Sequence, residues 1–239
     1  EPNATAIGGK TYMPPSNAQV LPMVFYNKTI FAANNVEVPT TWSEFLAAVK
    51  TFAAAGVTPI ELAGLDTWSA SMPVVALASA DVLGDDPNWI QERISGTVKF
   101  SDANFVAAMQ KGRDLVEAGA YSDSALSVDY GTANTNFFEG KSAMYIMGSW
   151  LVGQFPAETV EEFGSFAFPT NDGAIVVPLA VGGTTVVSAK SPHADKAMEF
   201  AKAWTLDTSG MKVLIESDGA FPLIKGRTIA DYGATVTGL

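Results

Sequence analysis

Two tryptophans stand where a predicted strand ends and a helix begins. Trp68 follows the predicted strand 60–63, and Trp150 follows the predicted strand 142–147. In open α/β sheets ligands bind at such strand ends, because a crevice opens there and helix N-termini offer free N–H groups. Asp66 lies beside Trp68, where its carboxylate can accept hydrogen bonds from a ligand or can serve as a loop or cap residue. The alternative for Trp150 is simple core packing.

The elements that position these residues centre on the stretch 130–150. Thr132 is expected to cap a short helix that Gly140 ends, since glycine adopts the left-handed conformation at little cost. Residues 142–147 form an apolar run too short for a helix, which predicts a buried strand. Ser149 can then cap a new turn of helix that carries Trp150.

Other segments predict the surrounding framework. Thr41 and Glu44 form a capping box for a helix with a core-packing stripe, and residues 21–26 read as a strand. The acidic segment 84–96 is expected to be a loop. A strand is expected at 185–189. A helix beginning at Ser191-Pro192 is then expected to bury an apolar stripe made of Ala197, Phe200, Ala201 and Trp204.

Composition excludes several classes of protein. The 239 residues are 48% hydrophobic and carry a net charge of −11, which argues against a nucleic-acid partner because phosphate binding needs clustered Lys and Arg. No apolar run approaches the length of a membrane span. The absence of cysteine excludes disulfides, thiolate catalysis and cysteine-ligated zinc.

Three segments together resemble one known family. They are F-x-E-G-K-x-A-M-x-x-x-G-S-W at 137–150, VFYNKTIFAANNVEVPTTWSEFLAAV at 24–49 and GGTTVVSAKSPHADKAMEFAKAW at 182–204. In this order and at this spacing they are similar to the extracellular solute-binding proteins of sugar ABC importers, the maltose-binding-protein-like family 1. The resemblance extends from Tyr12 to Gly226.

The resemblance implies an α/β fold of the periplasmic-binding-protein type II, with two lobes that each hold a mixed sheet flanked by helices. It assigns 16–171 to the second lobe, 172–222 to a returning segment of the first lobe and 223–239 to a truncated return to the second. Glu1-Pro2-Asn3 does not begin a signal peptide. The resemblance implies that family members begin well before the segment that matches Tyr12 onward and continue beyond Leu239, so we expect an internal fragment whose first lobe is incomplete.

The resemblance also implies a non-catalytic site for a carbohydrate, without metal or cofactor. Aromatic rings would cover the apolar face of a sugar, and polar groups would bind its hydroxyls. The expected ligand-binding residues are Trp68, Tyr130, Trp150, Asp66, Asn17, Gln19, Gly182, Gly183 and Thr184. Asn17 and Gln19 can equally be ordinary loop polars, and the paired glycines can form a bulge.

Two alternatives remain open at this point. A glycosidase needs a pair of carboxylates, but none of the 25 Asp and Glu residues stands in a catalytic motif, and His193 is expected to be an exposed first-turn residue. A binding protein of the same fold for iron, polyamine or another small solute is the other alternative. Iron would need clustered tyrosines and carboxylates as hard oxygen ligands.

The implied partners are a small-molecule sugar and the membrane permease of an ABC importer. The implied location is extracellular or periplasmic, with a membrane anchor through a lipidated N-terminus outside this sequence. An incomplete first lobe would expose apolar strand surface, so we expect residues 175–222 to self-associate or to rearrange.

Overall fold

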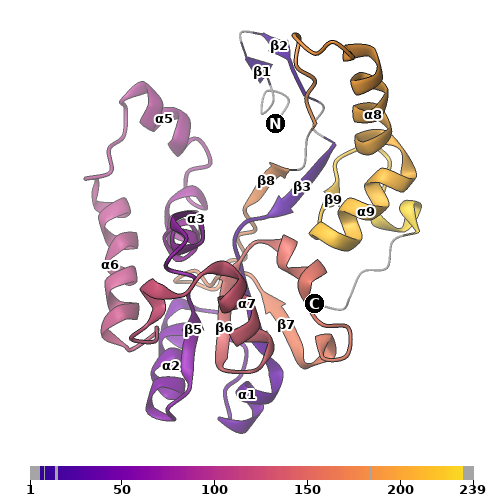
Figure 1. Ribbon diagram of the computed structural model, residues 1–239. Coiled ribbons are helices and arrows are strands. Elements are labelled where there is room, and N and C mark those ends of the chain that lie inside the picture. The colour runs from indigo at the N-terminus through magenta and orange to yellow at the C-terminus, as the bar shows by residue number, and fades with distance from the viewer. Residues whose placement is uncertain (1–5, 8, 14–15, 183–184, 234–239) are drawn as a thin grey trace. The chain divides into compact units, whose positions relative to one another are not determined.

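The computed structural model describes residues 6–7, 9–13, 16–182 and 185–233. Helices and strands alternate along the chain, which confirms the predicted α/β class (Figure 1). Within these residues, no helix is both long enough and apolar enough to cross a membrane.

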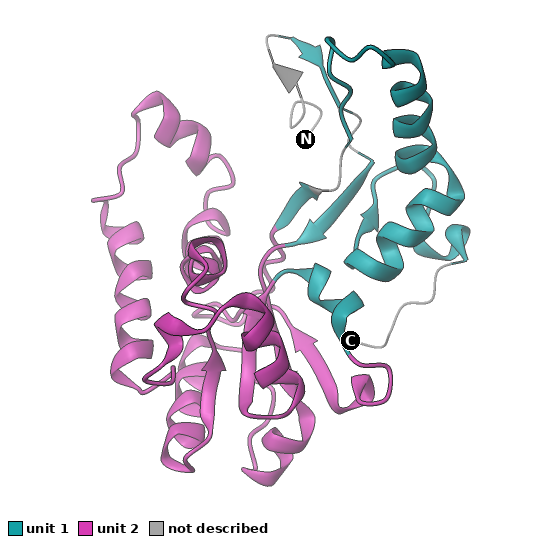
Figure 2. Ribbon diagram, viewed as in Figure 1, with its two compact units in different colours: residues 1–20, 148–155, 179–238 teal, residues 21–147, 156–178, 239 magenta. Residues whose placement is uncertain are grey.

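The chain divides into two compact units (Figure 2). Unit 1 draws on residues 1–20, 148–155 and 179–238, and unit 2 draws on residues 21–147 and 156–178. Each unit therefore gathers segments that are distant in the sequence. The predicted lobe bounds at 171/172 and 222/223 do not coincide with these divisions. The assignment of either unit to a first or second lobe stays a prediction.

Unit 2 is built on a mixed sheet with the strand order β5-β6-β4-β7. Its strands are β4 (Met23–Asn27), β5 (Thr58–Glu61), β6 (Ser142–Met147) and β7 (Phe163–Phe166). β5 runs parallel to β6, whereas β4 pairs antiparallel with β6 and with β7. Every residue of β6 is buried, as expected of a strand covered on both faces, so the strand predicted at 142–147 is confirmed.

The described helical segments of unit 2 are α1 (Lys28–Ala33), α2 (Trp42–Ala54), α3 (Thr67–Ala70), α4 (Met72–Ala78), the π-helix η1 (Ser79–Leu83), α5 (Trp89–Ser95), α6 (Ala103–Glu117), η2 (Ala125–Ser127), α7 (Tyr130–Phe138) and η4 (Val160–Glu162). The capping box of α2 is confirmed. The Glu44 amide donates to Thr41 Oγ1 at 3.3 Å, and the Thr41 amide donates to Glu44 Oε2 at 3.1 Å.

Two expectations for unit 2 are wrong. The segment 84–96 contains the helix α5 rather than only a loop, because Trp89 is buried and stacks on Phe105 with ring centroids 5.2 Å apart. The cap of α7 is Asp129 and not Thr132. Its carboxylate accepts a hydrogen bond from the Thr132 amide at 2.8 Å.

Unit 1 contains an antiparallel sheet with the strand order β8-β3-β9. Its strands are β3 (Asn17–Val20), β8 (Leu179–Gly182) and β9 (Phe221–Pro222), beside the short pair β1 (Ala6–Ile7) and β2 (Lys10–Thr11). Its described helical segments are η3 (Ser149–Gln154), α8 (Ala194–Leu206), α9 (Thr208–Asp218) and η5 (Ile229–Tyr232).

The strand positions in this part of the chain differ from expectation. Residues 185–189 form no strand, and the strand is instead β8, which pairs residue by residue with β3 from Asn17↔Gly182 to Val20↔Leu179. The strand predicted at 21–26 starts later, at Met23, because Pro22 has no N–H to donate to a ladder.

The predicted buried stripe of α8 is also wrong. Among its four members only Ala201 is buried, and Phe200 is 64% exposed. The Phe200 and Trp204 rings instead stack on each other, with centroids 6.2 Å apart, on a face that the described residues leave open. Unit 1 therefore presents an apolar helix face to its surroundings.

Candidate functional site in each unit

In unit 2 the structure brings Trp68 and Tyr130 together. Trp68 lies in the first turn of α3 and Tyr130 begins α7, so both rings stand at helix starts. The ring centroids are 4.9 Å apart and the planes meet at 62°, an edge-to-face arrangement that aromatic quadrupoles favour. Trp68 remains 45% exposed and Tyr130 is half-buried. The pair thus offers an accessible aromatic surface, which we call the aromatic shelf.

Asp66 anchors this shelf. Its Oδ2 accepts a hydrogen bond from the Tyr130 backbone N–H at 2.8 Å. Asp66 occupies the cap position of α3, but its side chain makes no capping bond there and serves the start of α7 instead. The neighbouring backbone reinforces the link, because the Gly64 amide donates to Ala125 and the Leu65 amide donates to Val128, each at 3.0 Å.

Gly64 is required by this close approach. A Cβ at that position would lie 2.5 Å from the carbonyl oxygen of Ala125 and 2.8 Å from Leu126 Cα. Since both contacts are with backbone, no side-chain rotation could relieve them. A glycine therefore lets the segment that carries Asp66 and Trp68 run directly against the segment that leads into Tyr130.

In unit 1 the Gly148-Ser149-Trp150 motif packs on itself. The six-membered ring of Trp150 lies against Gly148 so closely that a Cβ there would collide with it. Ser149 Oγ donates to the Gly219 carbonyl at 2.8 Å and accepts from the Val20 amide at 3.2 Å. The motif is thereby fixed to β3 and to the end of α9. Trp150 is half-buried, so it is neither sealed in the core nor fully open.

Gln19 and Asn17 lie on β3 in the same unit. Gln19 Nε2 donates to Asp218 at 2.9 Å for the carboxylate and 3.0 Å for the carbonyl. Burial raises the pKa of the Asp218 carboxyl, and the bond from Gln19 opposes that change. Asn17 is fully buried, with its amide 3.4 Å from Ser16 Oγ. Ligand contact by either residue stays a prediction.

Gly182 ends β8 opposite Asn17, whereas Gly183 and Thr184 lie outside the described residues. Sequence reasoning missed two buried or half-buried acids near the predicted residues, Asp218 and Glu61. Glu61 gave one weak signal, a single charged residue inside an apolar strand.

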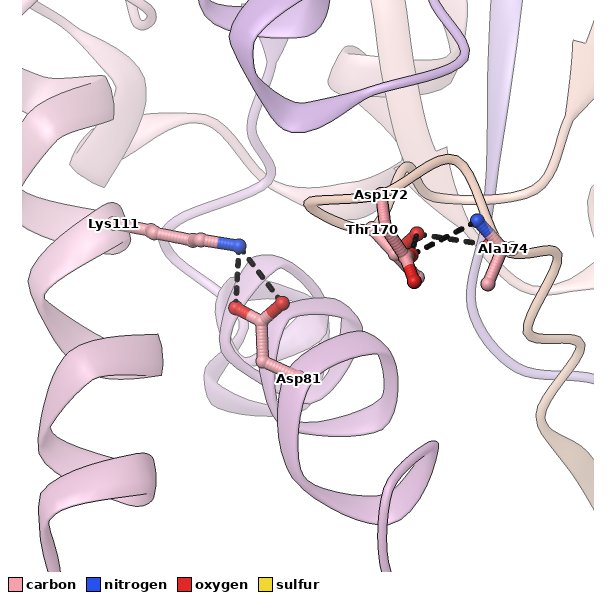
Figure 3. Close-up of polar contacts among 5 residues, drawn as sticks. All are labelled: Asp81, Lys111, Thr170, Asp172 and Ala174. Carbon is pink, nitrogen blue, oxygen red and sulfur yellow. Dashed lines mark hydrogen bonds and ion pairs between the residues drawn. The ribbon is translucent and has the colours of Figure 1, made fainter.

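A separate polar hollow of about 250 Å³ lies in unit 2 beside η1 and the turn at 170–174. Figure 3 shows Lys111 of α6 reaching the Asp81 carboxylate, at 2.6 and 2.8 Å from its two oxygens. Lys111 also lies 4.9 Å from the Trp42 ring centroid. On the turn, the Ala174 amide and the Thr170 hydroxyl donate to Asp172 and lower the pKa of its carboxyl. These carboxylates are thus occupied by the protein itself.

No group of three or more His, Cys, Asp and Glu side chains in the described part of the chain is arranged to hold a metal ion. His193 lies exposed at the cap of α8, as predicted. What the two units offer is therefore aromatic rings, carboxylates and amides.

A family model described as bacterial extracellular solute-binding protein matches residues 3–211, and the chain belongs to this family. The multiple sugar-binding protein of Streptococcus mutans is 27% identical over 228 residues, covering 94% of this chain and 54% of the relative. A probable sugar-binding periplasmic protein of Mesorhizobium japonicum is 25% identical over 224 residues, covering 91% of this chain and 50% of the relative. The chain thus spans about half the length of the curated relatives it matches.

Solved structures agree with this assignment. One from work on xylan utilization by Caldanaerobius polysaccharolyticus is 29% identical with a TM-score of 0.76, covering 91% of this chain and 57% of that one. A chitin oligosaccharide binding protein has a TM-score of 0.80 at 23% identity, covering 98% and 58%. RafE in complex with raffinose has a TM-score of 0.73 at 24% identity, covering 98% and 58%. The last two likenesses establish the fold alone.

The contact between Trp150 and Gly148 gives the first prediction. Replacing Gly148 with Ala should displace the indole and lower the free energy of unfolding by about 1–3 kcal/mol, the usual cost of overpacking. Chemical denaturation and near-ultraviolet circular dichroism would measure both effects. The matched control is Gly112→Ala in α6, where a Cβ meets only Leu77 at 3.4 Å. An unchanged spectrum and midpoint for Gly148→Ala would contradict this packing.

Proposed function

We propose that the protein captures a carbohydrate without altering it and delivers it to an ABC importer. The observation that carries the proposal is the aromatic shelf, an exposed indole and a phenol ring held edge to face beside a carboxylate. The sugar-binding names of the relatives and the raffinose complex of RafE support it.

The chemistry of a sugar suits these groups. A pyranose presents a face of C–H groups that an aromatic ring can cover, and a rim of hydroxyls that need hydrogen-bond partners. A buried hydroxyl or acceptor left unpaired costs about 1–3 kcal/mol, so carboxylates and amides beside the rings decide which sugar fits. Unit 2, taken by itself, provides Trp68, Tyr130 and Asp66 for this purpose.

We also propose that the bound sugar is not hydrolysed. Hydrolysis requires two carboxyl groups flanking the scissile bond, one of them protonated to act as an acid. Asp66 accepts the Tyr130 backbone N–H at 2.8 Å, which gives its carboxylate a hydrogen-bonding role. Extracellular or periplasmic location and a lipid anchor form part of the same proposal. The family description supports the former, and only the sequence resemblance supports the anchor.

The direct test is titration calorimetry of the purified chain against raffinose, chitin oligosaccharides and xylan oligosaccharides. We expect saturable binding to a member of this panel. Trp68→Ala should weaken it about tenfold or more, because a stacked ring is lost. Trp204→Leu on α8 is the matched control and should leave the affinity unchanged.

Other outcomes would contradict the proposal. Release of smaller sugars during the titration, detected by mass spectrometry, would indicate a glycosidase. No binding to the carbohydrate panel, together with saturable binding of an iron salt or a polyamine, would indicate another solute on the same fold.

A second part of the proposal is self-association through unit 1. Phe200 is 64% exposed, Leu179 on β8 is 62% exposed, and Trp204 extends the same apolar face of α8. β8 also pairs on one side only among the described strands, so its free edge can accept another strand. Exposed apolar side chains and a free strand edge of this kind favour a second copy as their cover.

Analytical ultracentrifugation tests this association. We expect the unaltered chain to sediment as a concentration-dependent dimer or larger species, and Phe200→Glu to sediment as a monomer. Ile94→Glu is the matched control, since Ile94 is also apolar and, at 82%, even more exposed than Phe200, but lies on α5 of unit 2. If the unaltered chain stays monomeric at every concentration, the proposed self-association is refuted.

A further inference from the structure

Glu61 is an acidic residue that is buried, which is energetically unfavourable for a charged carboxylate. It ends the central-sheet strand β5 and is only 7% exposed. Burial raises the pKa of its carboxyl, while the hydrogen bond from Asn136 and the positive charge of Lys141 act in the opposite direction. A carboxylate withdrawn from water needs specific partners, so its contacts indicate what it does.

The hydrogen bond of the Glu61 carboxylate leads to α7. Asn136, near the end of that helix, donates from Nδ2 to Glu61 Oε1 at 3.3 Å. At the other end of the helix the Tyr130 N–H donates to Asp66 Oδ2 at 2.8 Å. The segment from the end of β5 to the start of α3 therefore holds α7 at two points, through two carboxylates five residues apart in the sequence.

The neighbourhood of Tyr145 places these groups close together. Tyr145 of β6 is the parallel register partner of Glu61, so both side chains lie on the same face of the sheet. Tyr145 is buried, and its pKa is raised first by burial and then by Tyr130, Glu61 and Asp66. Glu61 thus lies in the same cluster as the residues that build the aromatic shelf.

We propose that Glu61 is a positioning residue for the aromatic shelf. By holding Asn136 it fixes the direction of α7, and this keeps the Tyr130 ring at its edge-to-face contact with Trp68. Lys141 does not replace this link, because its ammonium pairs with Glu139 at 2.7 Å and donates to Asn136 Oδ1 at 3.3 Å. The role in ligand binding rests on the proposed function, whereas the role in holding α7 does not.

Two substitutions separate positioning from mere stability. Glu61→Gln keeps an acceptor oxygen for Asn136 and removes the buried charge. The pKa of Glu61 is raised in the folded protein, so the contribution of Glu61 to folding stability is lost as pH rises through that pKa. Because Gln carries no charge, Glu61→Gln should be at least as stable as the unaltered chain at neutral pH. Glu61→Met also removes the charge and preserves the length of the side chain, but it offers Asn136 no acceptor.

The experiment is amide hydrogen exchange of the full chain, followed by mass spectrometry on peptides covering 130–138. Glu61→Met should exchange about tenfold faster there than the unaltered chain, as expected for the loss of a hydrogen bond to a charged group. Glu61→Gln should stay within about twofold of it. The matched control is Glu44→Met, which should speed exchange at the start of α2 and leave 130–138 unchanged.

The sugar affinity of the same variants is then measured by titration calorimetry. Glu61→Met should bind the sugar more weakly than Glu61→Gln, in parallel with its faster exchange at 130–138. Unchanged exchange at 130–138 in Glu61→Met would overturn the positioning role. If the unaltered chain binds no sugar, the proposed function fails, and the exchange result alone still decides whether Glu61 holds α7.

Discussion

The hydrogen bond between the Tyr130 N–H and the Asp66 carboxylate is the interaction on which the candidate site of unit 2 depends. It joins the start of α7 to the loop that follows β5. A helix start carries N–H groups without partners in the helix, and a carboxylate at that place satisfies one of them while matching the helix dipole. The same bond brings Tyr130 within 4.9 Å of Trp68, so one polar contact sets an aromatic pair that remains open to solvent.

Close backbone approach plays the corresponding part in unit 1. The Trp150 ring packs against Gly148. Gly153 lies against the backbone of Ser217, and Gly219 lies against the backbone of Ser149, so η3 packs directly on the end of α9. Gly219 also has a positive φ of 53°, which suits the turn after α9. Unit 1 thus holds its aromatic residue against glycines, whereas unit 2 combines the close approach at Gly64 with the hydrogen bond to Asp66.

Local patterns in the sequence predicted the local structure well. The capping box at Thr41 and Glu44 and the strand 142–147 depend on neighbouring residues, and both are confirmed. Two of the errors arise from distant contacts. Helix α5 forms around the stacking of Trp89 on Phe105, and the strand β8 is selected by its pairing with β3 rather than by its own residues.

The candidate site shows the same division. Spacing placed Trp68 at a helix start, but the contact between Trp68 and Tyr130 joins elements far apart in the chain. The position of Glu61 in a predicted strand marked it only weakly, since its role appears only when Asn136 of α7 lies beside it. The exposed face of α8 was also missed, because helical periodicity predicts which residues share a face and not whether anything covers that face.

The most direct measurement of the central claim is oxidative footprinting by mass spectrometry, with and without the sugar that binds best. If the aromatic shelf holds the sugar, saturation should slow the oxidation of Trp68 and Tyr130 and leave the half-buried Trp204 on α8 unchanged. Full reactivity of Trp68 at a sugar concentration that saturates binding would contradict the account.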